Sequence, residues 1–167
     1  MGIAQRLYQE GLITYMRTDS IRLSDVAIKA AREYISGNFS KAHLPNKPNL
    51  YGDSKNAQAA HEAIRPSGDK FITPEELLSR HKEESDEYKL YKLIFNTTVA
   101  SQMTDAKGIT KTIEIEVSNT DFSPLILSIS GTTWTFGGYR DLIKDATEKS
   151  QAVSYTHLRA HETKWHL

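Results

Sequence analysis

The fold class is set by two neighbouring stretches, SDEYKLYKLIFNTTVASQM at residues 85–103 and ITKTIEIEV at residues 109–117. In the first stretch, apolar and aromatic side chains recur every three or four residues, which predicts a helix with one buried face. In the second stretch the period is two, because isoleucines alternate with threonines and glutamates, which predicts a strand. A block of helices followed by strands indicates an α+β fold.

The aromatic residues of the long helix allow two interpretations. Tyr88, Tyr91 and Phe95 could form a platform on which nucleic-acid bases stack. Their helical spacing is more typical of a packed face against the core. We therefore expect these three rings to be buried.

Four shorter helices are expected before the long one. The residue pattern places the first three at residues 3–10, 25–36 and 58–65, and a capping box with proline at the first helical position starts the fourth at residues 73–76. Gly11 should close the first helix. Ser24 is the expected N-cap of the second and Gly37 its stop. Pro66 ends the third.

The C-terminal part is expected to contain further strands. They fall at residues 122–130 and 132–136, separated by Gly131. Residues 151–167 do not continue this pattern and are typical of added, non-native sequence. His157 and His161 in this tail have a helical spacing used in some metal sites, but the tail offers one acidic residue and no further ligand set. We expect domains at 1–106 and 107–150, followed by this tail.

The composition excludes several classes of protein. The 167 residues include no cysteine, which excludes disulfides, thiolate nucleophiles and cysteine-bound zinc. No stretch approaches the roughly 18 consecutive apolar residues of a membrane span, and no secretory signal is recognised, so we expect a cytoplasmic protein. Basic and acidic residues are equal at 21 each, so charge alone does not indicate a nucleic-acid partner.

Tyr15 and Arg17 form the first candidate site. Residues 12–16 are apolar, β-branched and aromatic, and predict a short strand on which Ile13, Tyr15 and Arg17 project to one side. A phenol is a weak nucleophile at neutral pH until a neighbouring group favours its anion, and a guanidinium can do this while also binding phosphate oxygens. The alternative is a packed tyrosine beside a surface arginine. Spacing alone leaves both open.

His61, Glu62 and Arg65 form the second candidate site. In the predicted helix His61 and Arg65 are four residues apart and share a face, from which both could donate to phosphate. Histidine also exchanges protons near neutral pH. The alternative is a merely solvated helix end.

Two strings in the sequence resemble the signature segments of the type IA DNA topoisomerases. They are ITYMRTDS at residues 13–20 and HEAIRP at residues 61–66. The preceding AQRLYQEG at residues 4–11 is also similar to the family's approach to its active-site tyrosine. Met16, between the tyrosine and the arginine, resembles bacterial DNA topoisomerase I more than topoisomerase III. The resemblance covers residues 3–145.

The resemblance implies a function and a role for each matching residue. Tyr15 would attack a phosphodiester of single-stranded DNA and form a 5′-phosphotyrosyl intermediate, whose reversal after strand passage relaxes negative supercoils without ATP. Arg17 would support the scissile phosphate, and His61 with Arg65 would bind the DNA backbone. Asp19 and Ser20 belong to the signature and would line the DNA site. The resemblance also implies a cytoplasmic protein that associates with the nucleoid.

The resemblance also implies what this chain lacks. In the family, Mg²⁺ is bound by an acidic cluster in an N-terminal domain that the sequence does not contain, so the chain alone is expected to be inactive. What remains resembles the helical tyrosine-bearing domain followed by part of the β-rich arch domain. Two other hypotheses stay open: a non-catalytic DNA-binding module of the same fold, and an unrelated helical regulator.

Overall fold

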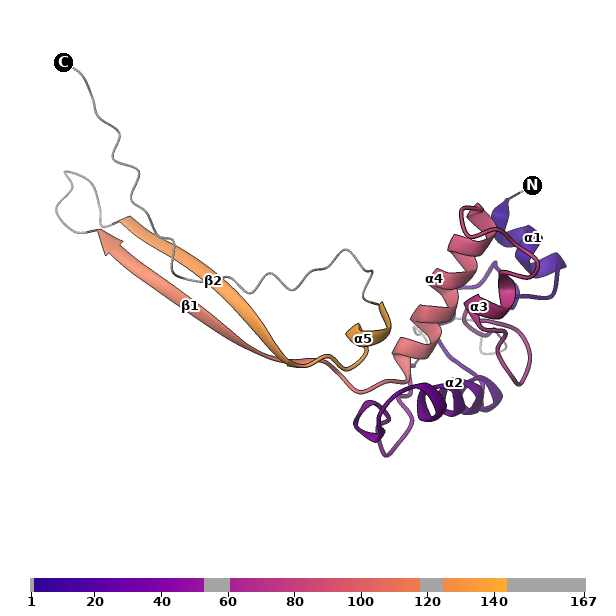
Figure 1. Cartoon of the computed structure of the whole chain (residues 1–167), viewed down its shortest axis with the longest axis horizontal. Coiled ribbons are helices and arrows are strands. Elements are labelled where there is room, and N and C mark those ends of the chain that lie inside the picture. The colour runs from indigo at the N-terminus through magenta and orange to yellow at the C-terminus, as the bar shows by residue number, and fades with distance from the viewer. Residues whose placement is uncertain (1, 53–60, 118–124, 144–167) are drawn as a thin grey trace, which may run out of the picture. The chain divides into compact units, whose positions relative to one another are not determined.

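The computed structural model describes residues 2–52, 61–117 and 125–143, and these form two compact units (Figure 1). The first unit is helical and comprises Met1–Ala106 with Gly137–Ile143. The second contains Lys107–Phe136 and is a β-hairpin. The sequence placed residues 137–143 with the strands, whereas in the structure they belong to the helical unit. Tail residues 151–167, with their histidines, lie outside the described ranges.

The helical unit contains the predicted long helix and several shorter ones. Its elements are α1 (Ile3–Gln9), α2 (Asp25–Asn38), the 3₁₀ helix η1 (Lys41–His43), α3 (Pro74–Leu77), α4 (Asp86–Ser101) and α5 (Arg140–Ile143). The side chains of Ser24 and Ser85 cap α2 and α4 by accepting hydrogen bonds from backbone N–H groups. Thr73 and Glu76 form the predicted capping box of α3.

The core of the helical unit is built on the aromatic face of α4. Tyr91, Phe95 and Val99 are almost completely buried there, which confirms a core face rather than a stacking platform. Phe95 meets the Tyr34 ring of α2 edge-on, with centroids 5.0 Å apart. The Tyr91 hydroxyl donates to the carbonyl of Ile72 at 2.6 Å, and burial, assisted by the charge of Glu76, raises the pKa of Tyr91.

The sequence predicted that Gly37 ends α2, but in the structure the helix continues past it. The helix continues to Asn38, whose side-chain amide donates to the Tyr34 carbonyl at 2.9 Å, and the N–H of Phe39 bonds to the Ile35 carbonyl. A glycine costs a helix about 1 kcal/mol relative to alanine. Ile35 is fully buried, so core packing outweighs that cost.

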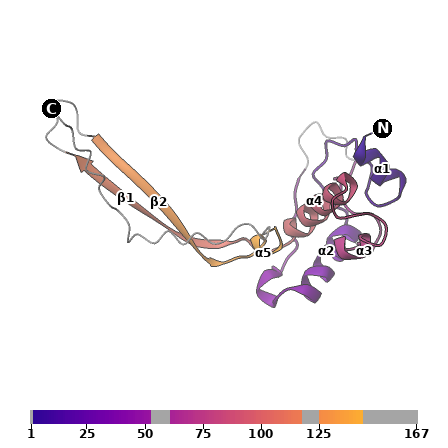
Figure 2. The same ribbon diagram turned by 45° about the horizontal axis from the view of Figure 1, so that its top comes forward.

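The hairpin consists of β1 (Lys107–Val117) and β2 (Leu125–Phe136), which pair antiparallel along their length (Figure 2). The prediction of two strands separated by Gly131 was wrong. Gly131 pairs with Lys111 inside the ladder and has no positive φ, so nothing turns the chain there. Residues 122–124 of the predicted strand lie outside the described ranges.

The two faces of the hairpin differ in chemistry. One face carries cross-strand threonine and serine pairs: Thr110–Thr132 and Thr112–Ser130, both 2.8 Å between hydroxyl oxygens. The other face is apolar, and its exposed side chains include Ile109, Ile113, Ile115, Leu127 and Ile129. This alternation of polar and apolar side chains is typical of an antiparallel strand pair that is buried on one face and exposed to solvent on the other. No helix in the described part of the chain is long and apolar enough to cross a membrane.

Candidate nucleic-acid cleavage site

The two signature segments lie side by side in the helical unit. The N–H of Thr14 donates to the carbonyl of Arg65 at 2.9 Å, and the N–H of Ser67 donates to the carbonyl of Leu12 at 2.9 Å. Between these bonds Ile13 and Pro66 form an isolated antiparallel bridge. Residues about fifty positions apart in the sequence are therefore held together by backbone hydrogen bonds.

This pairing replaces two elements that the sequence predicted. Residues 61–65 are not helical, because the N–H of Arg65 bonds to the Thr14 hydroxyl at 3.0 Å and that hydroxyl donates to the Ala63 carbonyl at 2.9 Å. His61 and Arg65 therefore share no helix face. The strand predicted at residues 12–16 is reduced to the single bridge at Ile13. Residues 58–60 lie outside the described ranges.

Glu62 fixes the second segment from within. Its carboxylate accepts two hydrogen bonds from Arg65, Nε to Oε1 at 2.7 Å and Nη2 to Oε2 at 3.2 Å. It also accepts one from the N–H of Ser24 at 2.9 Å, beside the start of α2. Burial acts to raise the pKa of Glu62, but the hydrogen bonds from Arg65 and Ser24 outweigh it and the pKa is lowered. Glu62 thus links this segment to α2.

The guanidinium of Arg65 is directed inward. Besides Glu62, its Nη1 donates to the carbonyls of Pro66 at 2.7 Å and Gly68 at 3.2 Å, and its side chain is only 10% exposed. A guanidinium bound in this way shapes the loop that follows it. Sequence reasoning grouped Glu62 with Arg65 but gave Glu62 no role. The sequence signal that could have indicated this ion pair is the opposite charge of two residues three positions apart, next to a proline.

Tyr15 and Arg17 are both at the surface. The Tyr15 side chain is 48% exposed, Arg17 is exposed, and neither makes a side-chain hydrogen bond or ion pair with the described residues. Because the strand stops at Ile13, which lies in the core, strand alternation does not relate Ile13 to the other two. A phenol and a guanidinium two residues apart are thus both available to a ligand.

The ring of Tyr15 does have an aromatic neighbour that sequence reasoning missed. Tyr8 of α1 lies with its ring centroid 5.3 Å from that of Tyr15, at an interplanar angle of 68°. No spacing rule relates positions 8 and 15, because the chain reverses between them at Gly11, where φ is 72°.

Asp19 and His61 lie close together, whereas Ser20 is buried nearby. His61 Nδ1 and Asp19 Oδ1 are 3.7 Å apart, and both side chains are partly exposed. The hydroxyl of Ser20 accepts a hydrogen bond from the N–H of Arg22 at 3.2 Å, and Arg22 in turn accepts one from the N–H of Ala63. One residue from each segment therefore forms the exposed pair, and Ser20 shapes the turn beneath it.

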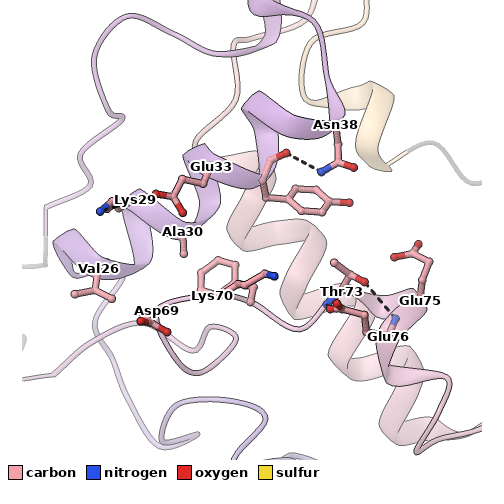
Figure 3. A pocket seen from close by; sticks show the side chains of 12 residues that line it. Val26, Lys29, Ala30, Glu33, Asn38, Asp69, Lys70, Thr73, Glu75 and Glu76 are labelled. Carbon is pink, nitrogen blue, oxygen red and sulfur yellow. Dashed lines mark hydrogen bonds and ion pairs between the residues drawn. The ribbon is translucent and has the colours of Figure 1, made fainter.

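A groove lies elsewhere in the helical unit. It has a volume of about 880 Å³ and runs between α2 and residues 69–76. Figure 3 shows its lining: Val26, Lys29, Ala30, Glu33, Tyr34, Asn38, Asp69, Lys70, Phe71, Thr73, Glu75 and Glu76. Burial, assisted by the charge of Glu75, raises the pKa of Tyr34. None of the six site residues predicted from the sequence lines this groove.

No metal site is formed by the residues that the structure describes. Those residues contain no group of three or more histidine or acidic side chains placed to hold a metal ion. Asp19 has His61 as its ion-pair partner rather than a second carboxylate. The described residues therefore do not fit Mg²⁺, and we assign it no step within this chain.

Comparison with known proteins gives the family. A family model described as DNA topoisomerase matches residues 1–163. The chain belongs to the type IA DNA topoisomerase family. The match extends past Gln151, where we expected the native sequence to end. Membership in this family removes the hypothesis of an unrelated helical regulator.

Individual relatives agree with this assignment. The chain is 49% identical over 140 residues to DNA topoisomerase 1 of Streptomyces coelicolor. The aligned region covers 83% of this chain and 14% of the relative. It is 48% identical over 140 residues to the Mycolicibacterium smegmatis protein of the same name, again covering 83% of this chain and 15% of the relative. The Vibrio cholerae protein is 48% identical over 118 residues, covering 71% and 13%. The chain therefore spans about one seventh of the length of these relatives.

Proposed function

We propose that this chain carries the nucleophile of a DNA topoisomerase that cleaves and rejoins one DNA strand. The oxygen of Tyr15 attacks a backbone phosphorus, a Tyr15–O–P bond forms, and the bond from phosphorus to the 3′ oxygen breaks. The phenol proton leaves and the departing strand takes one up as a 3′-hydroxyl. Attack by that hydroxyl reverses both bonds after a strand has passed, so negative supercoils are relaxed without ATP.

The observation that carries this proposal is the pair of free polar groups at Tyr15 and Arg17. Both side chains are exposed and unbonded among the described residues, beside a backbone that hydrogen bonds hold firmly at Thr14. A planar guanidinium matches phosphate oxygens and stabilises the charge that develops on them during attack.

The other four predicted residues take two kinds of role. His61 and Asp19 are partly exposed, so we propose that His61 binds a backbone phosphate while Asp19, 3.7 Å from its Nδ1, orients the ring. Arg65 and Ser20 are buried, so we propose that they act on DNA through the shape of the loops that they hold rather than by contact. This refines the expectation that both contact DNA.

The remaining requirements of the reaction lie outside this chain. We propose that Mg²⁺, which would supply charge neutralisation at phosphate, is held by a separate N-terminal domain of the same protein. The substrates are then single-stranded and negatively supercoiled DNA, and the protein works in the cytoplasm at the nucleoid. The chain by itself would not complete cleavage.

The proposal is tested by trapping the covalent intermediate. The chain is combined with the metal-binding domain, Mg²⁺ and a single-stranded oligonucleotide labelled on the strand that stays attached, and the reaction is stopped with detergent. We expect a labelled adduct with the wild-type chain and with Tyr51→Phe, and none with Tyr15→Phe. Tyr51 is a control because it is similarly exposed, although its hydroxyl donates to the Ser101 carbonyl. An adduct of equal yield in Tyr15→Phe would overturn the assignment. Oligonucleotide binding without any adduct would favour the non-catalytic DNA-binding module.

A further inference from the structure

Tyr8 is placed to orient the side chain that the proposed function makes the nucleophile. We propose that Tyr8 is a positioning residue for Tyr15: its ring holds the Tyr15 phenol in the direction needed for attack on phosphorus. This inference rests on the proposed function, because it matters only if Tyr15 reacts. It concerns a residue of α1 that lies outside both signature segments.

The contact between the two rings is specific. The centroids are 5.3 Å apart and the planes are inclined at 68°, which is the edge-on arrangement that aromatic pairs prefer. Both residues are nearly half exposed, at 42% for Tyr8 and 48% for Tyr15. Tyr8 is therefore no core residue, since the buried residue of α1 is Leu7.

Tyr8 stands on a rigid base. The side chain of Leu7 is fully buried, and Arg6 Nε donates to a carboxylate oxygen of Glu87 on α4 at 2.7 Å. After α1 the chain reverses, because Gly11 adopts a positive φ and the N–H of Leu12 bonds to the carbonyl of Leu7 at 2.9 Å. This reversal brings position 15 back beside position 8.

Tyr15 has little other support. Its backbone is fixed on one side, where the N–H of Thr14 bonds to the carbonyl of Arg65, but residues 15–24 form no helix or strand. Among the described residues, the contact with Tyr8 is the one ring contact, hydrogen bond or ion pair of the Tyr15 side chain. The contact leaves the Tyr15 hydroxyl free, so it can orient the nucleophile without occupying the reacting atom.

A positioning role makes a distinct kinetic prediction. Attack requires the phenol oxygen to lie in line with the bond that breaks, and misorientation of a reacting group costs rate rather than affinity. Removal of the Tyr8 ring should therefore slow single-turnover cleavage and leave the dissociation constant for the oligonucleotide unchanged. The Tyr8 hydroxyl makes no hydrogen bond with the described residues, so phenylalanine should substitute for tyrosine at this position.

The test uses Tyr8→Phe, Tyr8→Leu and the matched control Tyr51→Leu. In the 167-residue chain, NMR of selectively labelled tyrosine rings reports the Tyr15 ring, whose signals should be shifted by the Tyr8 ring current. We expect this shift to persist in Tyr8→Phe and Tyr51→Leu and to be lost in Tyr8→Leu. An unchanged Tyr15 spectrum in Tyr8→Leu would show that the contact does not form, and would overturn the inference.

The second measurement follows the chemistry in the chain supplied with the metal-binding domain. For Tyr8→Leu we expect the single-turnover cleavage rate to fall about tenfold or more with an unchanged dissociation constant. For Tyr8→Phe and Tyr51→Leu we expect wild-type rates. A wild-type rate in Tyr8→Leu, or a loss seen in the dissociation constant instead, overturns the inference while leaving Tyr15 as nucleophile. Equal adduct in Tyr15→Phe overturns the proposed function itself, whatever the ring spectrum shows.

Discussion

The guanidinium of Arg65 and the carboxylate of Glu62 form a two-point contact, 2.7 Å from Nε to Oε1 and 3.2 Å from Nη2 to Oε2. The same carboxylate accepts the N–H of Ser24, and Arg65 is bonded through its backbone to Thr14. Glu62 therefore joins the second signature segment to Ser24, the N-cap of α2, and the backbone of Arg65 joins it to the segment that carries Tyr15. Loss of the Glu62–Arg65 ion pair should therefore destabilise the site.

We predict that Glu62→Gln destabilises the helical unit by about 1–2 kcal/mol, because the neutral amide leaves a mostly buried guanidinium without its charged partner. Urea or thermal unfolding followed by circular dichroism measures this. Glu33→Gln is the matched control, since the Lys29–Glu33 pair is 3.9 Å long with side chains 79% and 65% exposed. That control should change stability by less than about 0.5 kcal/mol. Equal effects from both substitutions would show that the Glu62 contact is not structural.

The lowered pKa of Glu62 predicts a pH dependence with a definite sign. A carboxyl whose pKa is lower in the folded state than its ordinary value of 4.5 contributes stability that is fully present above that value. The contribution is lost as the pH falls through the folded-state pKa. Wild type should therefore lose stability below pH 4.5 more steeply than Glu62→Gln, as measured by denaturant unfolding at a series of pH values. Parallel pH profiles for the two proteins would contradict this.

The apolar face of the hairpin predicts self-association of the chain. Ile113 and Ile129 are cross-strand partners on that face and both are exposed, so neighbouring molecules can cover them. We expect Ile113→Lys to shift the chain toward monomer in sedimentation velocity at high concentration. Thr112→Lys, on the polar face, adds the same charge and should leave association unchanged. A wild-type chain that stays monodisperse at high concentration would refute the idea.

Arg17 is predicted to act in the chemical step. Arg17→Ala should lower the single-turnover cleavage rate by about 100-fold or more, because a charge aimed at the developing phosphoryl charge is removed. Arg17→Lys should recover part of the rate, since a lysine keeps the charge but not the planar fork. Arg80→Ala, which removes an exposed arginine outside the site, serves as the control. Wild-type rates in Arg17→Ala would rule out this role.

Local signals in the sequence predicted much of the helical unit. The three-to-four-residue spacing of Tyr91, Phe95 and Val99 predicted α4 and its buried face, and the capping box at Thr73 predicted α3. These features depend on neighbours along the chain, so a single sequence contains them. The helix predicted at residues 61–65 was wrong for the opposite reason. Their extended form depends on hydrogen bonds to Thr14, some fifty residues away, and no local propensity encodes such a pairing.

Some residues of the candidate site were likewise predicted from local sequence, and others were recognised only in the structure. Tyr15 and Arg17 were found because they lie two residues apart in one signature, and the structure places both at the surface. Tyr8 and Glu62 were not assigned roles. The position of Tyr8 beside Tyr15 depends on the chain reversal at Gly11, and the role of Glu62 depends on the inward direction of the Arg65 side chain. Both features arise only in the folded chain.

Peptide mapping of the trapped adduct shows whether the oxygen of Tyr15 bonds to DNA phosphorus. The chain is combined with the metal-binding domain, trapped on a single-stranded oligonucleotide, and digested with protease and nuclease before mass spectrometry. We predict a nucleotide phosphate on the peptide that contains Tyr15, with fragment ions that place it on that tyrosine. A phosphate located on any other residue, with the Tyr15 peptide unmodified, would show that Tyr15 is not the nucleophile.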